Sequence, residues 1–156
     1  MQSHAPSLKA RALQWLAGRE HSRQELRAKL LRAATDADAA ADIDALLDQL
    51  EASGLLSAAR FIEGRVHARA ARFGNRRIEH ELRRHGLVPD AAAQDQLRTT
   101  ELARAREVWR KKFGQPAANL AERAKQIRFL TARGFSGEVV RKLLSGADEP
   151  DEPDEH

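Results

Sequence analysis

Three predicted helix starts share one spacing of apolar residues, and this repeat constrains the fold more than any other feature. The starts lie at Ser22, Gly74 and Ser136. Apolar side chains follow each start four and eight residues later: Leu26 and Leu30, Ile78 and Leu82, Val140 and Leu144. Side chains at every fourth position lie on one face of a helix. The spacing therefore predicts three copies of one helical module.

The copies are two-helix units at 8–33, 58–85 and 119–145, with the remaining helices as connectors. A unit of this size cannot cover its own apolar face, so neighbouring units must stack. We expect an all-α fold in which these modules form an elongated array that can curve. An acidic, disordered tail follows at 148–156.

Composition also favours helices. Tyr is absent and aromatic residues make up 4% of the chain, whereas Ala, Leu, Arg and Glu are abundant. We expect about nine short helices, none stable alone. They begin near residues 8, 22, 43, 57, 75, 89, 101, 120 and 136. The eighth carries Leu120, Ala124, Ile127 and Leu130 on one face.

Capping residues mark several of these helix ends. Ser22 and Glu25 form a capping box, in which the Ser hydroxyl and the Glu carboxylate each accept a backbone hydrogen bond. On the first helix, Leu8, Leu13 and Leu16 form an apolar stripe with Trp15. Further starts and stops are expected at Ser57, Pro89, Gly134 and Ser136.

The chain has no segment that suggests secretion or membrane insertion. Its apolar stretches are only a few residues long, and the N-terminus lacks the order of a signal peptide. Cysteine is absent, which excludes disulfides and thiolate metal sites within the chain. We expect a cytoplasmic monomer.

Charge is divided unevenly along the chain. Residues 148–156 hold six acids and no Lys or Arg, so all 27 basic and 17 of the 23 acidic residues precede them. The body therefore carries a net charge of +10. Such a body attracts polyanions or acidic protein surfaces. A GC-rich genome is an alternative explanation for the many arginines and alanines. The tail is either a solubilising segment or a competitor that folds back on the basic face.

Arginines gather on two successive predicted helices. In the helix from Asn75, Ile78 and Leu82 face one side and four arginines with His80 face the other. Like charges this close repel by about 0.2–0.5 kcal/mol per pair, so a binding surface competes with an ordinary solvated face as the explanation. The residues predicted to contact a partner are Arg65, Arg69, Arg72, Arg76, Arg77, Arg83 and Arg84, with Lys111, Lys112, Arg133 and Arg141 as secondary contacts.

Catalytic and cofactor motifs are not found in the sequence. His80 and His85 are five residues apart, which points them to different faces of a helix rather than at one metal ion. No HExxH motif and no Gly-rich phosphate loop occurs, and the carboxylates are scattered among arginines. We expect neither enzyme activity, nor a metal, nor a cofactor.

An ordered series of short motifs spans residues 8–145. It comprises Ala12-Leu13, Arg19-Glu20-His21-Ser22-Arg23-Gln24-Glu25-Leu26, Gly54-Leu55-Leu56-Ser57 with Arg60-Phe61, Arg72-Phe73-Gly74 with Ile78 and Glu81-Leu82-Arg83, Lys111-Lys112-Phe113 and Leu130-Thr131-Ala132-Arg133-Gly134-Phe135-Ser136. The series resembles the RecX family of recombinase regulators. One position departs from the family pattern, which usually has Asp where this chain has Ala58.

The resemblance implies a fold of tandem three-helix repeats, similar to helix-turn-helix units, and a regulatory function. In this chain the implied repeats span 1–56, 57–99 and 100–147. Family members lodge in the helical groove of the RecA–single-stranded DNA filament and reduce ATP hydrolysis, strand exchange and coprotease activity. The implied partner is therefore a RecA filament, with single-stranded DNA as a further contact of the basic faces and no membrane. Recombination, DNA repair and the SOS response would be the regulated processes.

Two other functions fit part of the pattern. A helix-turn-helix transcriptional regulator would place one short-turn helix pair in a DNA major groove. Its recognition helix should carry polar base readers, whereas the helix from Asn75 offers mainly arginine. A helical scaffold without any link to nucleic acid is the third alternative.

Overall fold

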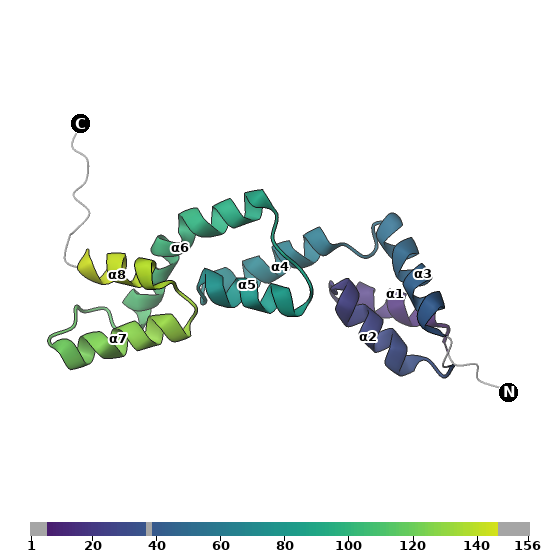
Figure 1. Cartoon of the computed structure of the whole chain (residues 1–156), viewed down its shortest axis with the longest axis horizontal. Coiled ribbons are helices and arrows are strands. Elements are labelled where there is room, and N and C mark those ends of the chain that lie inside the picture. Colours follow the sequence, from purple (N-terminus) through teal and green to yellow (C-terminus); the bar gives the residue numbers. More distant parts are fainter. Residues whose placement is uncertain (1–5, 37–38, 147–156) are drawn as a thin grey trace. The chain divides into compact units, whose positions relative to one another are not determined.

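The computed structural model describes residues 6–36 and 39–146, in which the regular elements are all α-helices (Figure 1). In this part of the chain the helices are α1 (Leu8–Gly18), α2 (Arg23–Ala33), α3 (Ala39–Ala52), α4 (Ala58–Ala70), α5 (Asn75–Arg84), α6 (Ala91–Lys112), α7 (Leu120–Ala132) and α8 (Gly137–Ser145). The all-helical prediction is confirmed. The acidic tail predicted at 148–156 lies outside the described residues.

Helix α6 replaces two of the nine predicted helices. Its 22 residues contain neither Gly nor Pro and many strong helix formers, so nothing breaks the helix near residue 100. Its N-cap is Asp90, whose carboxylate accepts a hydrogen bond from the Ala93 N–H at 2.8 Å. The prediction that Pro89 opens the first turn was wrong by two residues, because Pro89 precedes the cap. Helix α6 runs across the predicted boundary between the second and third repeats.

The chain divides into two compact units. The first unit is Met1–Gly64 with Leu82–Leu87, and the second is Arg65–Glu81 with Val88–His156. Helices α4 and α5 contribute residues to both. The division into three repeats at 1–56, 57–99 and 100–147 stays a prediction.

The core of the first unit is built by α1, α2 and α3. Its buried side chains are Ala12, Leu26, Leu30, Ala39, Ile43, Leu47, Leu50 and Leu56. Leu8, Trp15 and Leu16 pack against this core as predicted, but Leu13 is 37% exposed. Ala12 takes the buried position on α1, so the inward face is rotated by one residue from the predicted stripe.

The core of the second unit lies between α6, α7 and α8. Its buried side chains are Ala105, Val108, Trp109, Leu130, Phe135, Val140 and Leu143. Leu143 is the fully buried leucine of α8, whereas Leu144, chosen from the repeat, is only half-buried. The Trp109 indole N–H donates to the buried Gln126 amide oxygen at 3.0 Å. The Gln126 amide in turn donates to the Gln115 carbonyl at 3.2 Å, which secures the loop before α7.

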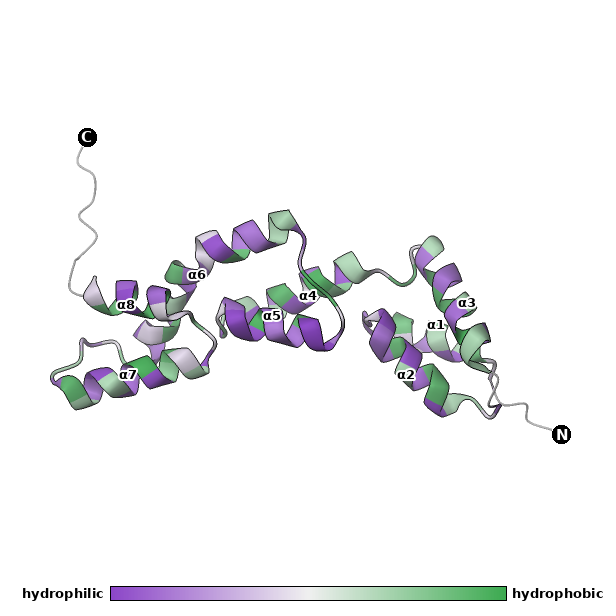
Figure 2. Cartoon of the chain, in the orientation of Figure 1, coloured by the Kyte–Doolittle hydropathy of each residue, from purple (hydrophilic) through white to green (hydrophobic). Residues whose placement is uncertain are grey.

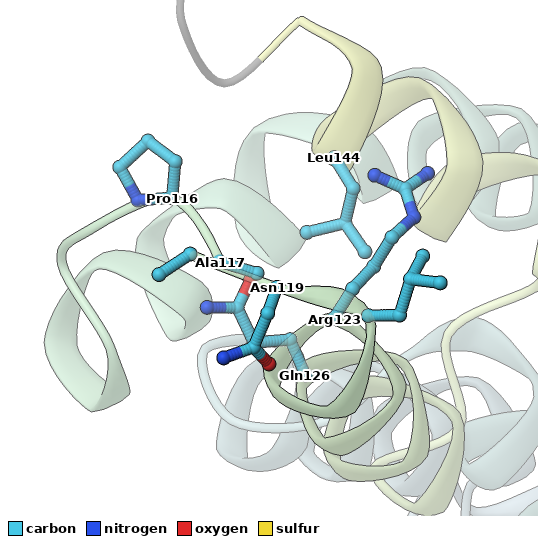
Figure 3. A pocket seen from close by; sticks show the side chains of 8 residues that line it. Pro116, Ala117, Asn119, Arg123, Gln126 and Leu144 are labelled. Atoms are coloured by element: carbon cyan, nitrogen blue, oxygen red, sulfur yellow. The ribbon is translucent and has the colours of Figure 1, made fainter.

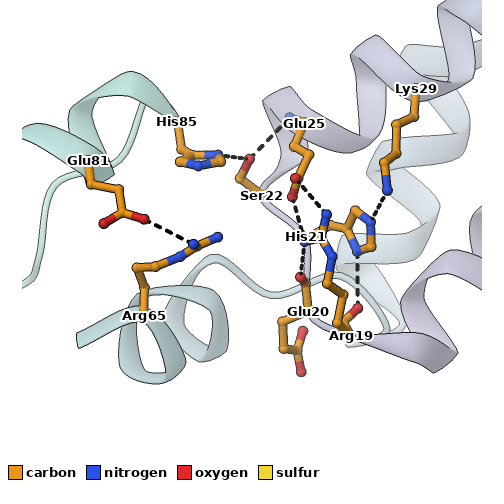
Figure 4. A network of polar contacts seen from close by, with 9 residues as sticks. All are labelled: Arg19, Glu20, His21, Ser22, Glu25, Lys29, Arg65, Glu81 and His85. Atoms are coloured by element: carbon orange, nitrogen blue, oxygen red, sulfur yellow. Dashed lines mark hydrogen bonds and ion pairs between the residues drawn. The ribbon is translucent and has the colours of Figure 1, made fainter. Parts of the chain in front are cut away.

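The predicted serine caps are confirmed. Ser22, Ser57 and Ser136 each accept a hydrogen bond from the N–H three residues ahead, at 3.1–3.2 Å. Ala58 does not disturb the cap beside it. The Glu25 carboxylate, predicted to bond back to the Ser22 N–H, receives two hydrogen bonds from the Arg19 guanidinium, at 3.0 and 2.8 Å (Figure 4).

The pair of Arg19 and Glu25 should make the first unit sensitive to acid. Hydrogen bonding from Arg19 lowers the pKa of Glu25 from 4.5 to about 2. Because the folded-state pKa is the lower one, the stabilisation is complete above pH 4.5 and is lost as the pH falls towards 2. Solvent screens the half-exposed Arg19, so we expect no more than about 1 kcal/mol. A carbon-detected NMR titration should place the Glu25 midpoint near pH 2 and move it towards 4.5 in Arg19→Gln, while Arg32→Gln leaves it unchanged.

A buried histidine lies in the turn between α1 and α2, close to Arg19 in the sequence. His21 is 1% exposed, with Nε2 2.8 Å from the Lys29 ammonium and Nδ1 3.0 Å from the Arg19 carbonyl (Figure 4). An ammonium can only donate, so Nε2 accepts and Nδ1–H donates to the carbonyl. The ring is therefore neutral, and burial lowers its pKa. His21 acts as a structural link between α2 and the turn before it.

Candidate partner-binding surface

Phe73 lies in the turn between α4 and α5, within the second unit. Helix α4 ends at Ala70, and its last turn is closed by hydrogen bonds from the Arg72 and Phe73 N–H groups to the Arg69 carbonyl, at 3.0 and 2.9 Å. The ring is half-buried, so one part packs and another meets solvent. The sequence places basic residues on both sides of this ring along the chain.

Four guanidinium groups surround the Phe73 ring. The guanidinium carbon of Arg77 is 4.0 Å from the ring centroid, and those of Arg133, Arg72 and Arg69 lie at 5.5, 5.7 and 6.0 Å. Each such cation–π contact contributes about 0.5–1 kcal/mol at an exposed site. A guanidinium held by its face keeps its in-plane N–H groups for a carboxylate or phosphate.

A second ring extends the basic surface onto α7. The guanidinium carbon of Arg133 is 5.0 Å from the Phe129 centroid, and the Lys112 ammonium is 5.5 Å from it. Phe113 packs edge-on against Phe129, with centroids 5.3 Å apart. Arg133 thus bridges the two aromatic rings. We call Arg72, Arg77, Arg133 and Lys112, with the rings of Phe73 and Phe129, the arginine cluster.

Acidic residues neutralise only part of this region. Glu81 forms a salt bridge with Arg65 at 2.9 Å (Figure 4). It forms a second one with Arg69 at 3.3 Å. Within residues 6–36 and 39–146, no salt bridge joins Arg72, Arg77 or Arg133 to a carboxylate. Of the four guanidinium groups around Phe73, only that of Arg69 is paired with a carboxylate in this part of the chain. The other three repel one another, and a bound anion would relieve this repulsion.

Two turns in backbone contact hold the cluster in place. The Gly74 N–H donates to the Arg133 carbonyl at 2.8 Å, and the Arg76 N–H donates to the Gly134 carbonyl at 3.1 Å. Gly134 has φ +92°, which an L side chain rarely adopts. A Cβ atom on it would lie 2.5 Å from Arg77 Cβ. The turn between α4 and α5 and the turn between α7 and α8 therefore fit together only with glycine at both positions.

Glu101 secures the same junction from α6. This carboxylate is 5% exposed; one oxygen accepts the Asn75 N–H at 2.8 Å and the other accepts the Ser136 hydroxyl at 3.3 Å. Asn75 opens α5 and Ser136 caps α8, so one anion lies at the N-terminal ends of two helices, where negative charge is favourable. Sequence reasoning missed Glu101. The sequence does hold an indication of its role. Glu101 lies four residues after Leu97 and four before Ala105, so it occupies a position on the apolar face of the helix.

Arg104, one turn further along α6, closes the C-terminal end of α4. Its guanidinium donates to the carbonyls of Ala70 and Phe73, at 3.1 and 2.9 Å, and to the Asn75 side chain. Burial lowers the pKa of Arg104, while the nearby Glu101 charge raises it. This arginine was also missed, because the carbonyl groups that it contacts are about thirty residues away in sequence. Arg104 fixes the turn that carries Phe73.

The structure places the eleven predicted contact residues in different settings. Arg72, Arg77, Arg133 and Lys112 come together in the arginine cluster, and Arg76 is exposed beside it on α5. The others are outside the cluster: Arg65 and Arg69 bridged to Glu81, Lys111 paired with Glu107 at 4.0 Å, Arg141 exposed on α8, and Arg83 and Arg84 in the first unit.

The predicted faces of α5 are confirmed. Ile78 and Leu82 are fully buried, and the arginines and His80 are exposed on a helix that is largely hydrophilic (Figure 2). Within the described ranges, no group of three or more His, Cys, Asp or Glu residues is placed to hold a metal ion. No helix in that same part of the chain is long and apolar enough to cross a membrane.

Two family models match the chain. They are described as the first three-helix domain of RecX, over residues 9–50, and the third three-helix domain of RecX, over residues 99–144. A "Regulatory protein RecX" from Leptothrix cholodnii is 54% identical over 152 residues, covering 95% of each chain. Another with this name, from Ralstonia pickettii, is 51% identical over 145 residues and covers 92% of this chain and 89% of the relative.

A solved structure shares the fold. The crystal structure of RecX from Lactobacillus salivarius aligns with a TM-score of 0.69 over 90% of this chain and 94% of that chain, at 19% sequence identity. The fold therefore persists where most side chains differ. With identities above 50% along nearly the whole length of several relatives, this chain belongs to the RecX family of regulatory proteins.

Proposed function

We propose that this chain is a non-enzymatic regulator that binds the RecA–single-stranded DNA filament in its helical groove. Binding inhibits ATP hydrolysis, strand exchange and coprotease activity, and so regulates recombination, DNA repair and the SOS response. In this proposal the chain acts as a cytoplasmic monomer and needs no cofactor. Membership of a family of regulatory proteins supports the regulatory part.

The observation that carries the proposal is the arginine cluster. Arg72, Arg77 and Arg133 surround one aromatic ring, and two interlocked turns fix their backbones. Fixed guanidinium groups lose little conformational entropy when they bind, and each can grip a carboxylate or phosphate with two hydrogen bonds. Acidic protein surface and the DNA backbone in a filament groove both offer such anions.

Inhibition follows if the chain prefers one state of the filament. A filament that hydrolyses ATP must move its protomers between states, so a ligand that binds one spacing more tightly shifts the population towards it. The basic body, with a net charge of +10 before residue 148, adds attraction beyond the cluster itself. Modest contacts with neighbouring protomers can then combine through avidity.

The test is ATP hydrolysis by the cognate RecA on single-stranded DNA, titrated with this chain at fixed, near-physiological salt. We expect saturable inhibition at less than one chain per RecA protomer. The triple variant Arg72→Glu, Arg77→Glu and Arg133→Glu should raise the concentration for half-inhibition at least tenfold, since one lost charge-assisted contact of about 1.5 kcal/mol already has this effect.

A matched control carries the same change of charge elsewhere. Lys9→Glu, Arg32→Glu and Lys125→Glu alter three exposed residues outside the cluster and should leave half-inhibition within about threefold of the parent. Equal losses in both triple variants would show that net charge acts without a defined surface. If the parent gives no inhibition but binds a specific duplex with a plateau at raised salt, the helix-turn-helix alternative replaces the proposal.

A further inference from the structure

Two adjoining hollows lie between α7 and α8 in the second unit. Their volumes are about 300 and 280 Å³, and Arg123 and Leu144 line both. We call the two hollows together the groove. Figure 3 shows the first hollow, where Arg123 extends from α7 towards Leu144 and the loop of Pro116 lies on the opposite side. The second continues along α8 past Val140 and Arg141.

The groove combines an apolar floor with basic residues. Leu120 is 85% exposed and Ile127 is 37% exposed, although they share a face of α7 with the buried Leu130. Arg123 and Arg141 flank this floor, and no carboxylate lines either hollow. Among the described residues neither arginine forms a salt bridge, whereas Lys142 beside them is paired with Glu138 at 3.3 Å. A fitting ligand is therefore acidic, with apolar groups at intervals.

The chain itself contains such a segment, directly after α8. The helix ends at Ser145, beside Leu144 at the middle of the groove, and the sequence continues as Asp148-Glu149-Pro150-Asp151-Glu152-Pro153-Asp154-Glu155. Two acids and a proline recur with a period of three. A polyproline II helix has three residues per turn, so it would place both prolines on one face and the six acids on the other two.

The lengths also match. Ten residues of polyproline II extend about 31 Å, at about 3.1 Å per residue. Helix α8 has nine residues and therefore spans about 13 Å. A segment that starts at residue 147 can thus turn back and follow the groove along the whole of α8. A short tether gives an effective concentration on the order of 1 mM, so even a weak contact would be mostly occupied.

We propose that the acidic segment 148–155 binds in the groove between α7 and α8 of the same chain. Pro150 and Pro153 lie against the apolar floor, and the carboxylates pair with Arg123 and Arg141. The segment is then an internal competitor for acidic ligands of the second unit. This inference does not depend on which partner the chain regulates.

Paramagnetic relaxation in the full chain tests the proposal. The chain has no cysteine, so Glu155→Cys provides a single site for a nitroxide spin label. At low salt we expect methyl signals of Ile127, Val140 and Leu144 to broaden most strongly. The broadening should fall by more than half in about 0.5 M salt, because the pairing groups are solvent-exposed. Broadening that is absent, or spread evenly over the chain, would overturn the proposal.

Two variants separate this groove from general basic attraction. Arg123→Glu with Arg141→Glu should abolish the broadening, whereas Lys125→Glu with Arg128→Glu, on exposed positions of α7 outside the groove, should preserve it. Equal effects of the two variants would contradict the proposal. So would broadening of an isotope-labelled chain by a separate spin-labelled chain at the same total concentration, since the occupant would then be a second copy. Unchanged helical circular dichroism confirms that each variant folds.

Discussion

Gly74→Ala is expected to lower the free energy of unfolding of the second unit by about 3 kcal/mol or more. A Cβ atom at this position would lie 2.3 Å from the carbonyl carbon and oxygen of Gly134 and from the Phe135 nitrogen. All three are backbone atoms, so no flexible side chain can move aside. The two turns must separate, which breaks the hydrogen bonds that the Gly74 and Arg76 N–H groups donate across the junction.

Urea unfolding measured by Trp109 fluorescence reports this loss. Trp15 belongs to the first unit and Trp109 to the second, so a Trp15→Phe background isolates the second unit. Gly137→Ala is the matched control, because Gly137 also belongs to the second unit and a Cβ atom at this position meets nothing within 4 Å. A Gly74→Ala variant as stable as this control would show that the turns are not interlocked.

Local sequence rules predicted most helix ends of the fold. The serine caps and the glycine after α7 depend on residues within one turn, and the structure confirms them. The errors arose where tertiary packing decides how long a helix is or which of its faces is buried. Nothing in the sequence near residue 100 distinguishes one long helix from two, and the inward face of α1 shifted because Ala12 fills the position beneath α2 and α3.

The arginine cluster was predictable only in part. Helical periodicity correctly exposed the arginines of α5, but it could not show that Glu81 pairs with Arg65 and Arg69. The meeting of Phe73 with Arg133 joins positions sixty residues apart and has no local signature. Glu101 stood at an apolar position of its helix, and a buried carboxylate implies donors from elsewhere in the chain. That signal could have indicated the junction before its partners were known.

Glu101→Ala is expected to destabilise the second unit by about 3 kcal/mol. The substitution removes the acceptor of the Asn75 N–H and of the Ser136 hydroxyl, which open α5 and α8. It also leaves the half-buried Arg104 without the nearby carboxylate that favours its charged form. The loss should appear as a lower urea midpoint of Trp109 fluorescence in the Trp15→Phe background.

Glu107→Ala on the same helix is the control for this substitution. It makes the same change of helix propensity and charge, but Glu107 forms a surface ion pair with Arg110, whose side chain is 68% exposed. We expect a loss below about 1 kcal/mol from this variant. Glu101→Gln keeps one carbonyl acceptor and should fall between the two. If Glu101→Ala cost no more than Glu107→Ala, the carboxylate would not hold the helix ends together, and the rigidity of the arginine cluster would rest on the glycine turns alone.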